Sequence, residues 1–250
     1  MEFQFNHQGK NYQYASTRYF DLSTPIRNGE HNVNAYYLDD PSFETYKAGD
    51  FVGSVVQGGA CNCETITFNA HGNGTHTECV GHISDQGHTI NDCLRDFYAM
   101  AKLISVTPTK KENGDLFIPV SVLDAIDLST IDAIVIRSLP NSESKLTQRY
   151  SGSNPTYLDP LLTKKLAENN ILHVIVDVPS VDREEDGGHL LAHHAFWQYP
   201  EKPRTNATIT ELAYIPDEAK DDLYLLHLSI AAFASDASPS KPLLYVLKEV

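Results

Sequence analysis

Several features are absent from this chain of 250 residues, and each absence excludes a class of protein. It has no run of about 18 apolar residues, the length that a membrane-spanning helix requires. Its first segment, Met1 to Tyr14, lacks the basic and then apolar layout of a secretory signal. Internal repeats and low-complexity tracts are also absent. We therefore expect a soluble, cytoplasmic protein that forms one domain over residues 1–250.

Basic residues are scarce. The chain carries 19 Lys and Arg against 33 Asp and Glu, which gives a formal net charge of −14. No cluster of Lys or Arg interrupts this excess. A strongly anionic protein is repelled by the phosphate backbone of nucleic acid and by an anionic membrane surface. We therefore expect a small-molecule substrate and neither nucleic acid nor membrane as a partner.

Cysteine is sparse as well, with four residues at Cys61, Cys63, Cys79 and Cys93. Four cysteines in a chain of this size are too few for a disulfide framework, so we expect reduced thiols. Cys61 and Cys63 form a C-x-C pair that can supply soft metal ligands. Without a second such pair, buried small residues are the simpler interpretation.

Short apolar runs separated by turn signals fill the rest of the chain. We expect strands over residues 18–25, 65–68, 101–106, 133–139, 173–179, 208–215, 222–230 and 241–250. Helical patterns cover residues 158–170 and 189–197, and residues 28–47 predict a loop that could cover a substrate. A helix followed by a buried strand is typical of α/β proteins, so the sequence predicts a mixed sheet with packed helices.

A histidine-rich segment, HGNGTHTECVGH, indicates a site of chemistry. If its second half is extended, alternation places His76, Glu78 and His82 on one side. A turn through Gly72–Gly74 can fold His71 back toward His76. Imidazoles with a carboxylate are a ligand set for zinc or manganese. The alternative interpretation is that these are separately hydrogen-bonded polar residues near a turn.

A second group of candidates lies later in the chain. In HLLAHHAFW, His189 and His193 are four residues apart and share one helical face, while His194 points elsewhere. Glu211 shares a strand face with Ile209, where a carboxylate is costly unless it is paired or bound to metal. The simpler alternatives are a histidine that caps or packs the helix and a glutamate exposed at a strand end.

These blocks resemble the cyclase family of metal-dependent hydrolases, which includes bacterial kynurenine formamidases. The resemblance rests on FDLS, HGNGTHTECVGH and VDVPSVD followed by AHH, in that order along most of the chain. It implies an α/β domain with a central barrel-like mixed sheet and packed helices, of the swivelling β/β/α type. It also implies a homodimer or a higher homo-oligomer.

The resemblance implies a set of metal ligands, namely His71, His76, Glu78, His193 and Glu211. It places the catalytic acid/base at His82. It further implies one or two ions of zinc or manganese. The implied reaction is hydrolysis of an amide, formamide, lactam or cyclic ester of a small molecule, as in an arylformamidase.

Four departures from the family pattern leave rival functions open. They are an extra residue between His71 and His76, Glu78 in place of aspartate, Val80 in place of proline, and a longer stretch before Glu211. One rival is a non-catalytic metal- or ligand-binding protein with the same fold. Another is a cysteine hydrolase that pairs Cys79 with His82. In an extended segment, the side chains of Cys79 and His82 project to opposite faces, which argues against direct contact between them.

The expected substrate region also departs from the family, whose substrate-contacting tryptophan follows the DLS motif. Here that region reads NGEHNVNAYY, and Trp197 is the only tryptophan. Tyr36, Tyr37 and His31 could form an aromatic pocket wall or serve as packing anchors. Arg137, at the end of an expected strand, fits a surface ion pair better than a site residue.

Overall fold

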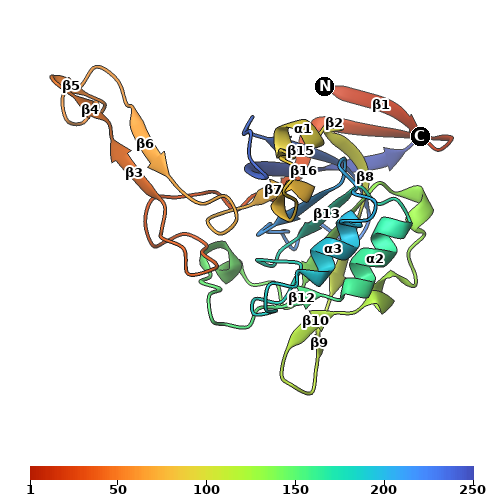
Figure 1. Ribbon diagram of the computed structural model, residues 1–250. Coiled ribbons are helices and arrows are strands. Elements are labelled where there is room, and N and C mark those ends of the chain that lie inside the picture. Colours follow the sequence, from red (N-terminus) through yellow and green to blue (C-terminus); the bar gives the residue numbers. More distant parts are fainter.

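Seven strands of the computed structural model, which describes residues 1–250, close into a barrel (Figure 1). Their order around the barrel is β16 (Ala237–Glu249), β15 (Leu223–Ile230), β8 (Tyr98–Val106), β11 (Ala133–Ser138), β13 (His173–Val176), β14 (Thr208–Glu211) and β7 (His76–Glu78). The run from β8 to β14 is parallel, and the other neighbours are antiparallel. The pairing of β7 with β16 closes the barrel. The predicted barrel-like mixed sheet is confirmed.

The parallel strands are buried on both faces, which explains their continuous apolar sequence. In β11, Ile134 and Ile136 point to the core shared with the helices, while Ala133 and Val135 point into the barrel. Each face of the strand is therefore covered. Of the predicted site residues, His76, Glu78 and Glu211 lie at the ends of the short strands β7 and β14.

Two helices cover one side of the sheet and lie next to each other (Figure 1). The first, α2 (Pro160–Glu168), begins at an N-cap where the Asp159 side chain accepts a hydrogen bond from the Leu161 amide. The second, α3 (Leu191–Trp197), is shorter than predicted, so His189 lies outside it and is exposed. A shared helical face for His189 and His193 is therefore wrong. No helix is both long and apolar enough to cross a membrane.

Trp197 ends α3 and is a packing residue. Its side chain is fully buried, and its indole nitrogen donates a hydrogen bond of 2.9 Å to the Ala207 carbonyl. A buried indole N–H needs such a partner. The only tryptophan of the chain thus packs in the core between helix and sheet.

Smaller elements complete the fold. A hairpin of β1 (Glu2–His7) and β2 (Lys10–Asp21) adds to the β16 edge, and a short sheet combines β12 (Tyr157–Leu158), β10 (Leu116–Ile118) and β9 (Thr109–Lys110). A further helix, α1, spans Ile90–Cys93. Single 3₁₀ turns cover Val80–His82, Val120–Leu123, Leu128–Thr130 and Glu143–Thr147. The strand expected at residues 18–25 is the end of β2, which stops at Asp21.

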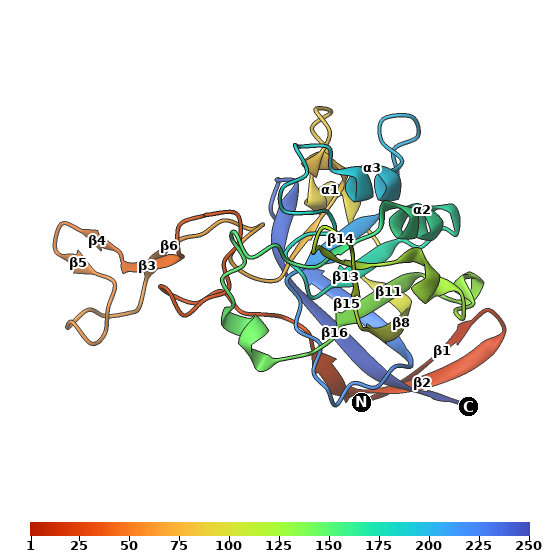
Figure 2. The ribbon, with the colours of Figure 1, turned by 90° about the horizontal axis from the view of Figure 1, so that it is seen from below.

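A long arm projects from the barrel, as both views show (Figures 1 and 2). It contains two ribbons, β3 (Ser42–Thr45) with β6 (Glu64–Thr67) and β4 (Lys47–Ala48) with β5 (Phe51–Val52). The strand predicted at residues 65–68 thus exists, but in the arm, and part of the predicted loop 28–47 is β3. Cys61 and Cys63 are exposed on the arm, so burial is wrong for them.

Candidate metal centre

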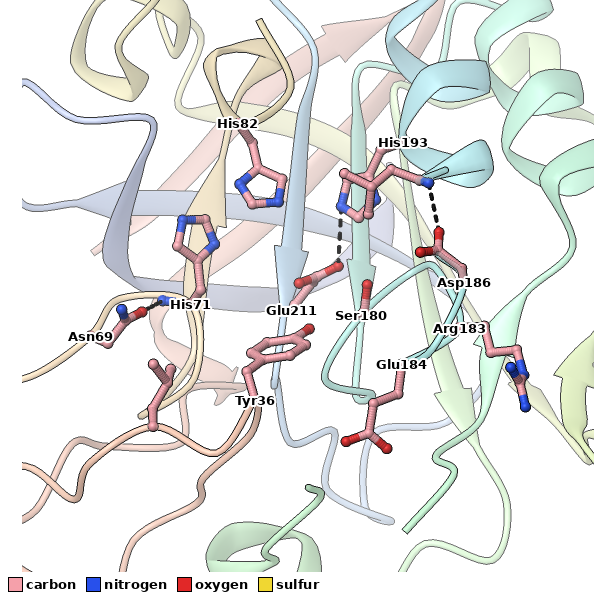
Figure 3. Close-up of a pocket in the computed structure, with 12 residues that line it drawn as sticks. Tyr36, Asn69, His71, His82, Ser180, Arg183, Glu184, Asp186, His193 and Glu211 are labelled. Carbon is pink, nitrogen blue, oxygen red and sulfur yellow. Dashed lines mark hydrogen bonds and ion pairs between the residues drawn. The ribbon is translucent and has the colours of Figure 1, made fainter. Parts of the chain in front are cut away.

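A cavity of about 340 Å³ opens where the strand ends of the barrel meet the loop before α3 (Figure 3). Twelve residues line it: Tyr36, Leu38, Asn69, His71, His82, Ser180, Arg183, Glu184, Asp186, Leu190, His193 and Glu211. Four of the predicted site residues are among them, and the other two, His76 and Glu78, lie buried behind the cavity wall. The structure therefore brings all six predicted residues together.

Strand β7 carries two of the ligand candidates, His76 and Glu78. It pairs with β14 on one side, where His76 lies opposite Glu211, and with β16 on the other, where Glu78 lies opposite Ala237. As a result, His76 Nε2 is 3.4 Å from Glu211 Oε2. His76 and Glu211 are far apart in sequence, and their buried side chains meet because β7 closes the barrel between β14 and β16.

His82 lies next to the same cluster, but the backbone that places it there differs from the predicted one. The extended segment ends at Glu78, and a 3₁₀ turn follows, capped by the Cys79 side chain. This turn brings His82 Nδ1 to 3.7 Å from Glu78 Oε2. The predicted convergence is confirmed, but alternation along one extended strand is the wrong reason for it.

His71 folds back through a turn, as predicted. Its ring centroid is 5.2 Å from that of His76, and its Nδ1 is 3.2 Å from Glu78 Oε2. The turn packs tightly, because a Cβ on Gly72 would lie 3.0 Å from the Ala35 carbonyl oxygen and closer still to the Leu38 side chain. A larger residue at position 72 would therefore displace the loop that carries His71.

His193 projects from α3 into the cluster. Its Nε2 is 3.0 Å from Glu78 Oε1 and 3.7 Å from Glu211 Oε1, while its Nδ1 is 2.6 Å from Asp182 Oδ2. Asp182 also accepts hydrogen bonds from the amides of Ala192 and His193, at 2.7 and 3.1 Å, so it fixes both the helix start and the imidazole. This carboxylate was missed, although it ends the VDVPSVD block.

Electrostatics bind the cluster together. Burial alone would raise the pKa of Glu78, but His82 and His193 hold it well below its usual value. Burial alone would lower the pKa of His71, yet the hydrogen bond with Asp236 and the neighbouring carboxylate of Glu78 raise it to about 10. Burial likewise opposes the raised pKa of His193, which Glu78 and Asp182 produce. The ionised Glu78 carboxylate in the middle of the cluster therefore favours positive charge next to it.

Five buried side-chain atoms lack a hydrogen-bond partner, and two of them, His76 Nε2 and Glu78 Oε2, belong to this cluster. An unsatisfied buried polar atom costs about 1–3 kcal/mol. Imidazole nitrogen and carboxylate oxygen are ligand atoms for zinc and manganese. The ligand atoms of His71, His76 and Glu78 also lie within 4.8 Å of one another, so a divalent cation fits these residues.

A second carboxylate, Asp236, was also missed. Its Oδ2 is 2.9 Å from His71 Nε2 and 3.1 Å from His82 Nδ1. The residue directly precedes β16, in a stretch, FASDASP, that contains no metal-binding pattern. Only the closure of the barrel brings it to the cluster, so no local signal could have found it.

Strained backbone surrounds the cavity. Tyr36, Leu190 and Leu212 have φ angles of 60°, 44° and 53°, in the left-handed region that side chains rarely adopt. Tyr36 and Leu190 line the cavity, and Leu212 directly follows Glu211, the last residue of β14. Such strain costs about 1–3 kcal/mol per residue and clusters at functional sites.

Of the other residues considered in the sequence, only Tyr36 lines the cavity. Tyr36 lines the cavity, and its hydroxyl donates to the Pro179 carbonyl at 2.6 Å, whereas Tyr37 and His31 are exposed outside it. Arg137 forms the expected ion pair, with Asp221 at 3.3 Å, but the arginine itself is buried and also donates to the carbonyls of Pro216 and Ala219.

Cys79 does not line the cavity. Its thiol is buried in the barrel core, where a hydrogen bond with Cys93, together with burial, raises its pKa above the usual range. A thiol with a raised pKa is a poor nucleophile at neutral pH. The geometry gives no support to a cysteine hydrolase.

Comparison with known proteins gives a family and a fold. The family model described as "Putative cyclase" matches residues 20–183. A potential metal-dependent hydrolase with cyclase activity superposes with a TM-score of 0.66 at 17% identity, over 91% of this chain and 97% of that one. Isatin hydrolase A from Labrenzia aggregata gives 0.67 at 14% identity, over 92% and 93%.

A predicted metal-dependent hydrolase from Bacillus stearothermophilus is similar in the same way, with a TM-score of 0.65 at 18% identity, over 91% of this chain and 98% of that one. No curated protein matches the chain. At these identities the solved structures establish the shared fold.

Proposed function

Because this chain belongs to the cyclase family, we propose that it is a metal-dependent hydrolase that cleaves an amide, formamide, lactam or cyclic ester of a small molecule. One observation carries the proposal. A buried cluster of imidazoles and carboxylates, with two buried ligand atoms that have no hydrogen-bond partner, lies at an open cavity. Hydrolytic metal sites need such a set of ligands beside a space for substrate.

The ligands divide into two positions that share Glu78. Its Oε2 faces His71, which with His76 forms the first position. Its Oε1 faces His193, which we pair with Glu211, 3.7 Å from the His193 Nε2, as the second. A carboxylate with one oxygen toward each position can bridge two ions. We therefore propose one or two zinc or manganese ions, held by nitrogen and oxygen ligands alone.

A divalent cation at this centre supplies Lewis acidity, which lowers the pKa of water and polarises a carbonyl. His82 lines the cavity beside the cluster, and its Nε2 makes no hydrogen bond within the protein. This nitrogen takes a proton from the attacking water as the new C–O bond forms. It then returns that proton to the leaving nitrogen or oxygen as the scissile bond breaks, and an acid and an amine or alcohol result.

The cavity lining points to an uncharged substrate. Arg183 is the only Lys or Arg that lines it, and its Nε already donates to Asp115 Oδ2 at 2.9 Å. No free Lys or Arg side chain in the lining remains to bind a substrate carboxylate. Tyr36, Leu38 and Leu190 provide the apolar surface, which suits a compact aromatic amide. Lactams and N-formylarylamines are both members of this class, and isatin hydrolases have a similar fold.

Metal content and turnover test the proposal together. We expect near-stoichiometric zinc or manganese in purified wild-type protein, and its loss in both His76→Ala and Glu211→Ala, because the two residues come from distant segments. Glu168→Gln, an exposed control on α2, should retain metal. The wild type should hydrolyse a member of a panel of lactams, N-formylarylamines and lactones. Bound metal with no turnover on the panel would favour the non-catalytic binding protein.

We further propose that the chain forms a homodimer through its arm. A two-stranded ribbon is marginally stable alone in water. The arm also exposes apolar side chains, with Val56 97%, Ile66 50% and Tyr46 47% exposed. A second copy could cover them. Light scattering after gel filtration should give twice the chain mass, and Val56→Asp with Ile66→Asp should give a monomer, whereas Leu161→Asp on α2 should not.

The exposed thiols of Cys61 and Cys63 are unpaired. Free exposed thiols persist in reducing compartments. We therefore propose a cytoplasmic location, which fractionation of the native host would check. Recovery in a secreted or periplasmic fraction would contradict it.

A further inference from the structure

Asp236 links two histidines that have different roles in the proposed function. Its Oδ2 is 2.9 Å from His71 Nε2 and 3.1 Å from His82 Nδ1. Its other oxygen accepts a hydrogen bond of 3.0 Å from the Ser235 hydroxyl. The backbone is fixed too, because the Cys79 amide donates to the Asp236 carbonyl at 3.0 Å. The carboxylate is therefore held in place rather than free to move with solvent.

Each contact engages one ring nitrogen and leaves the other available; in His82 the contact of Nδ1 with Asp236, at 3.1 Å, is closer than the 3.7 Å from the same atom to Glu78 Oε2. His71 directs Nδ1 at Glu78 Oε2, 3.2 Å away, and leaves Nε2 for Asp236. His82 gives Nδ1 to Asp236 and leaves Nε2 without a protein partner. A ring nitrogen that donates to a carboxylate carries the proton, so the opposite nitrogen is free to bind a metal or accept a proton.

The His193 side of the cluster repeats this arrangement with its own carboxylate. His193 Nδ1 is 2.6 Å from Asp182, and Nε2 faces Glu78 and Glu211. Two different segments thus place an aspartate behind a cluster histidine. The difference is that Asp182 serves one ring, whereas Asp236 serves a metal ligand and the acid/base at once.

We propose that Asp236 is a positioning residue that fixes the tautomers of His71 and His82 together, so that His71 presents Nδ1 to the metal and His82 presents Nε2 to the substrate. The inference rests on the proposed hydrolase function. Direct ligation by Asp236 is the competing role, because its Oδ2 and the two ring nitrogens lie within 4.8 Å of one another. That role would require His71 to bind metal through both nitrogens.

The test uses metal-loaded protein and the variants Asp236→Asn and Asp236→Ala. Loss of an outer carboxylate typically weakens metal binding about 10–100-fold. We expect that weakening in the zinc Kd, measured by competition with a chromophoric chelator, with the metal stoichiometry at saturation unchanged. Asp124→Asn removes one negative charge from an exposed site remote from the cluster and should match the wild type.

The second readout is the tautomer of His82, from long-range ¹⁵N–¹H correlation spectra at pH 8. The wild type should carry its proton on Nδ1, and both variants should lose this preference, with a shifted pH profile of kcat/KM. An unchanged zinc Kd and unchanged spectra would overturn the inference. Loss of a whole metal equivalent at saturation would also overturn it in favour of ligation.

Failure of the proposed function would look different. If the wild type binds no metal and hydrolyses nothing, the hydrolase proposal fails. The spectra of metal-free wild type and Asp236→Asn would still decide whether Asp236 fixes the His82 tautomer. Thermal melts of each variant, compared with Asp124→Asn, show that the protein tested is folded.

Discussion

Glu78→Gln should remove most of the stabilisation that metal gives to this protein. Glu78 is fully buried, and its two oxygens face His71 on one side and His193 on the other. Glutamine has nearly the same shape, but its amide offers only one neutral oxygen as a ligand. It therefore cannot bridge two cations as a carboxylate can. We expect its metal Kd to rise by at least about 100-fold, more than the about 10–100-fold typical of an outer carboxylate.

The expected magnitude follows from mass action. At a free metal concentration 100 times the wild-type Kd, binding stabilises the folded state by about 2.7 kcal/mol. That raises the Tm of a chain of this length by roughly 5–11 °C. In Glu78→Gln the same concentration only equals the weakened Kd, so the stabilisation falls to about 0.4 kcal/mol and the Tm rises by less than about 2 °C.

Differential scanning calorimetry with and without a chelator measures both shifts. Glu168→Gln, exposed on α2, makes the same chemical change away from the site and should keep the full shift. The melt of metal-free Glu78→Gln reports on its folding independently. A metal-induced shift in Glu78→Gln equal to that of wild type would refute the bridging role and the two-position interpretation of the cluster.

Three further predictions concern residues outside the cluster. Burial lowers the pKa of His173 to about 4, so its neutral form stabilises the fold above pH 6.5 and this contribution, up to roughly 3 kcal/mol, is lost as the pH falls through about 4. His173→Gln should flatten that slope in urea unfolding followed between pH 7 and 4. Trp197→Phe leaves the Ala207 carbonyl unpaired and should cost about 2–3 kcal/mol in the same assay. Cys79→Ala should keep turnover within a few-fold of wild type in steady-state kinetics, and a loss of about 1000-fold would revive the thiol nucleophile.

The strands of the barrel were predictable because burial on both faces produces continuous apolar runs. The segments 133–139 and 173–179 became β11 and β13, each shorter at its end. What could not be predicted is which strands become neighbours. Strand β7 is three residues long, yet it pairs with both β14 and β16 and closes the barrel. Nothing in its own sequence specifies either partner.

In the site too, residues in local motifs were predictable and contacts made by distant segments were not. The six residues named from the sequence come together. The motif around His71 and the AHH run made five of them recognisable, whereas Glu211 lies on β14 and meets His76 only because β14 pairs with β7. The supporting carboxylates, Asp182 and Asp236, were missed because an outer aspartate needs no fixed spacing from the histidine that it supports. The prediction for His189 failed for a local reason, since Leu190 is left-handed and the helix starts only at Leu191.

Two departures of this chain from the family pattern, Glu78 and the extra residue before His76, lie next to each other in the structure. A glutamate at position 78 reaches about 1.5 Å farther than aspartate, one carbon–carbon bond. The turn before His76 is longer by one residue and includes Asn73, which is fully buried and whose Oδ1 accepts the Asn69 amide at 2.7 Å. The added length is therefore packed rather than loose. His71 Nδ1 lies 3.2 Å from Glu78 Oε2, and Asp236 contacts the other ring nitrogen at 2.9 Å, so the longer carboxylate and the longer loop are both in contact within the cluster.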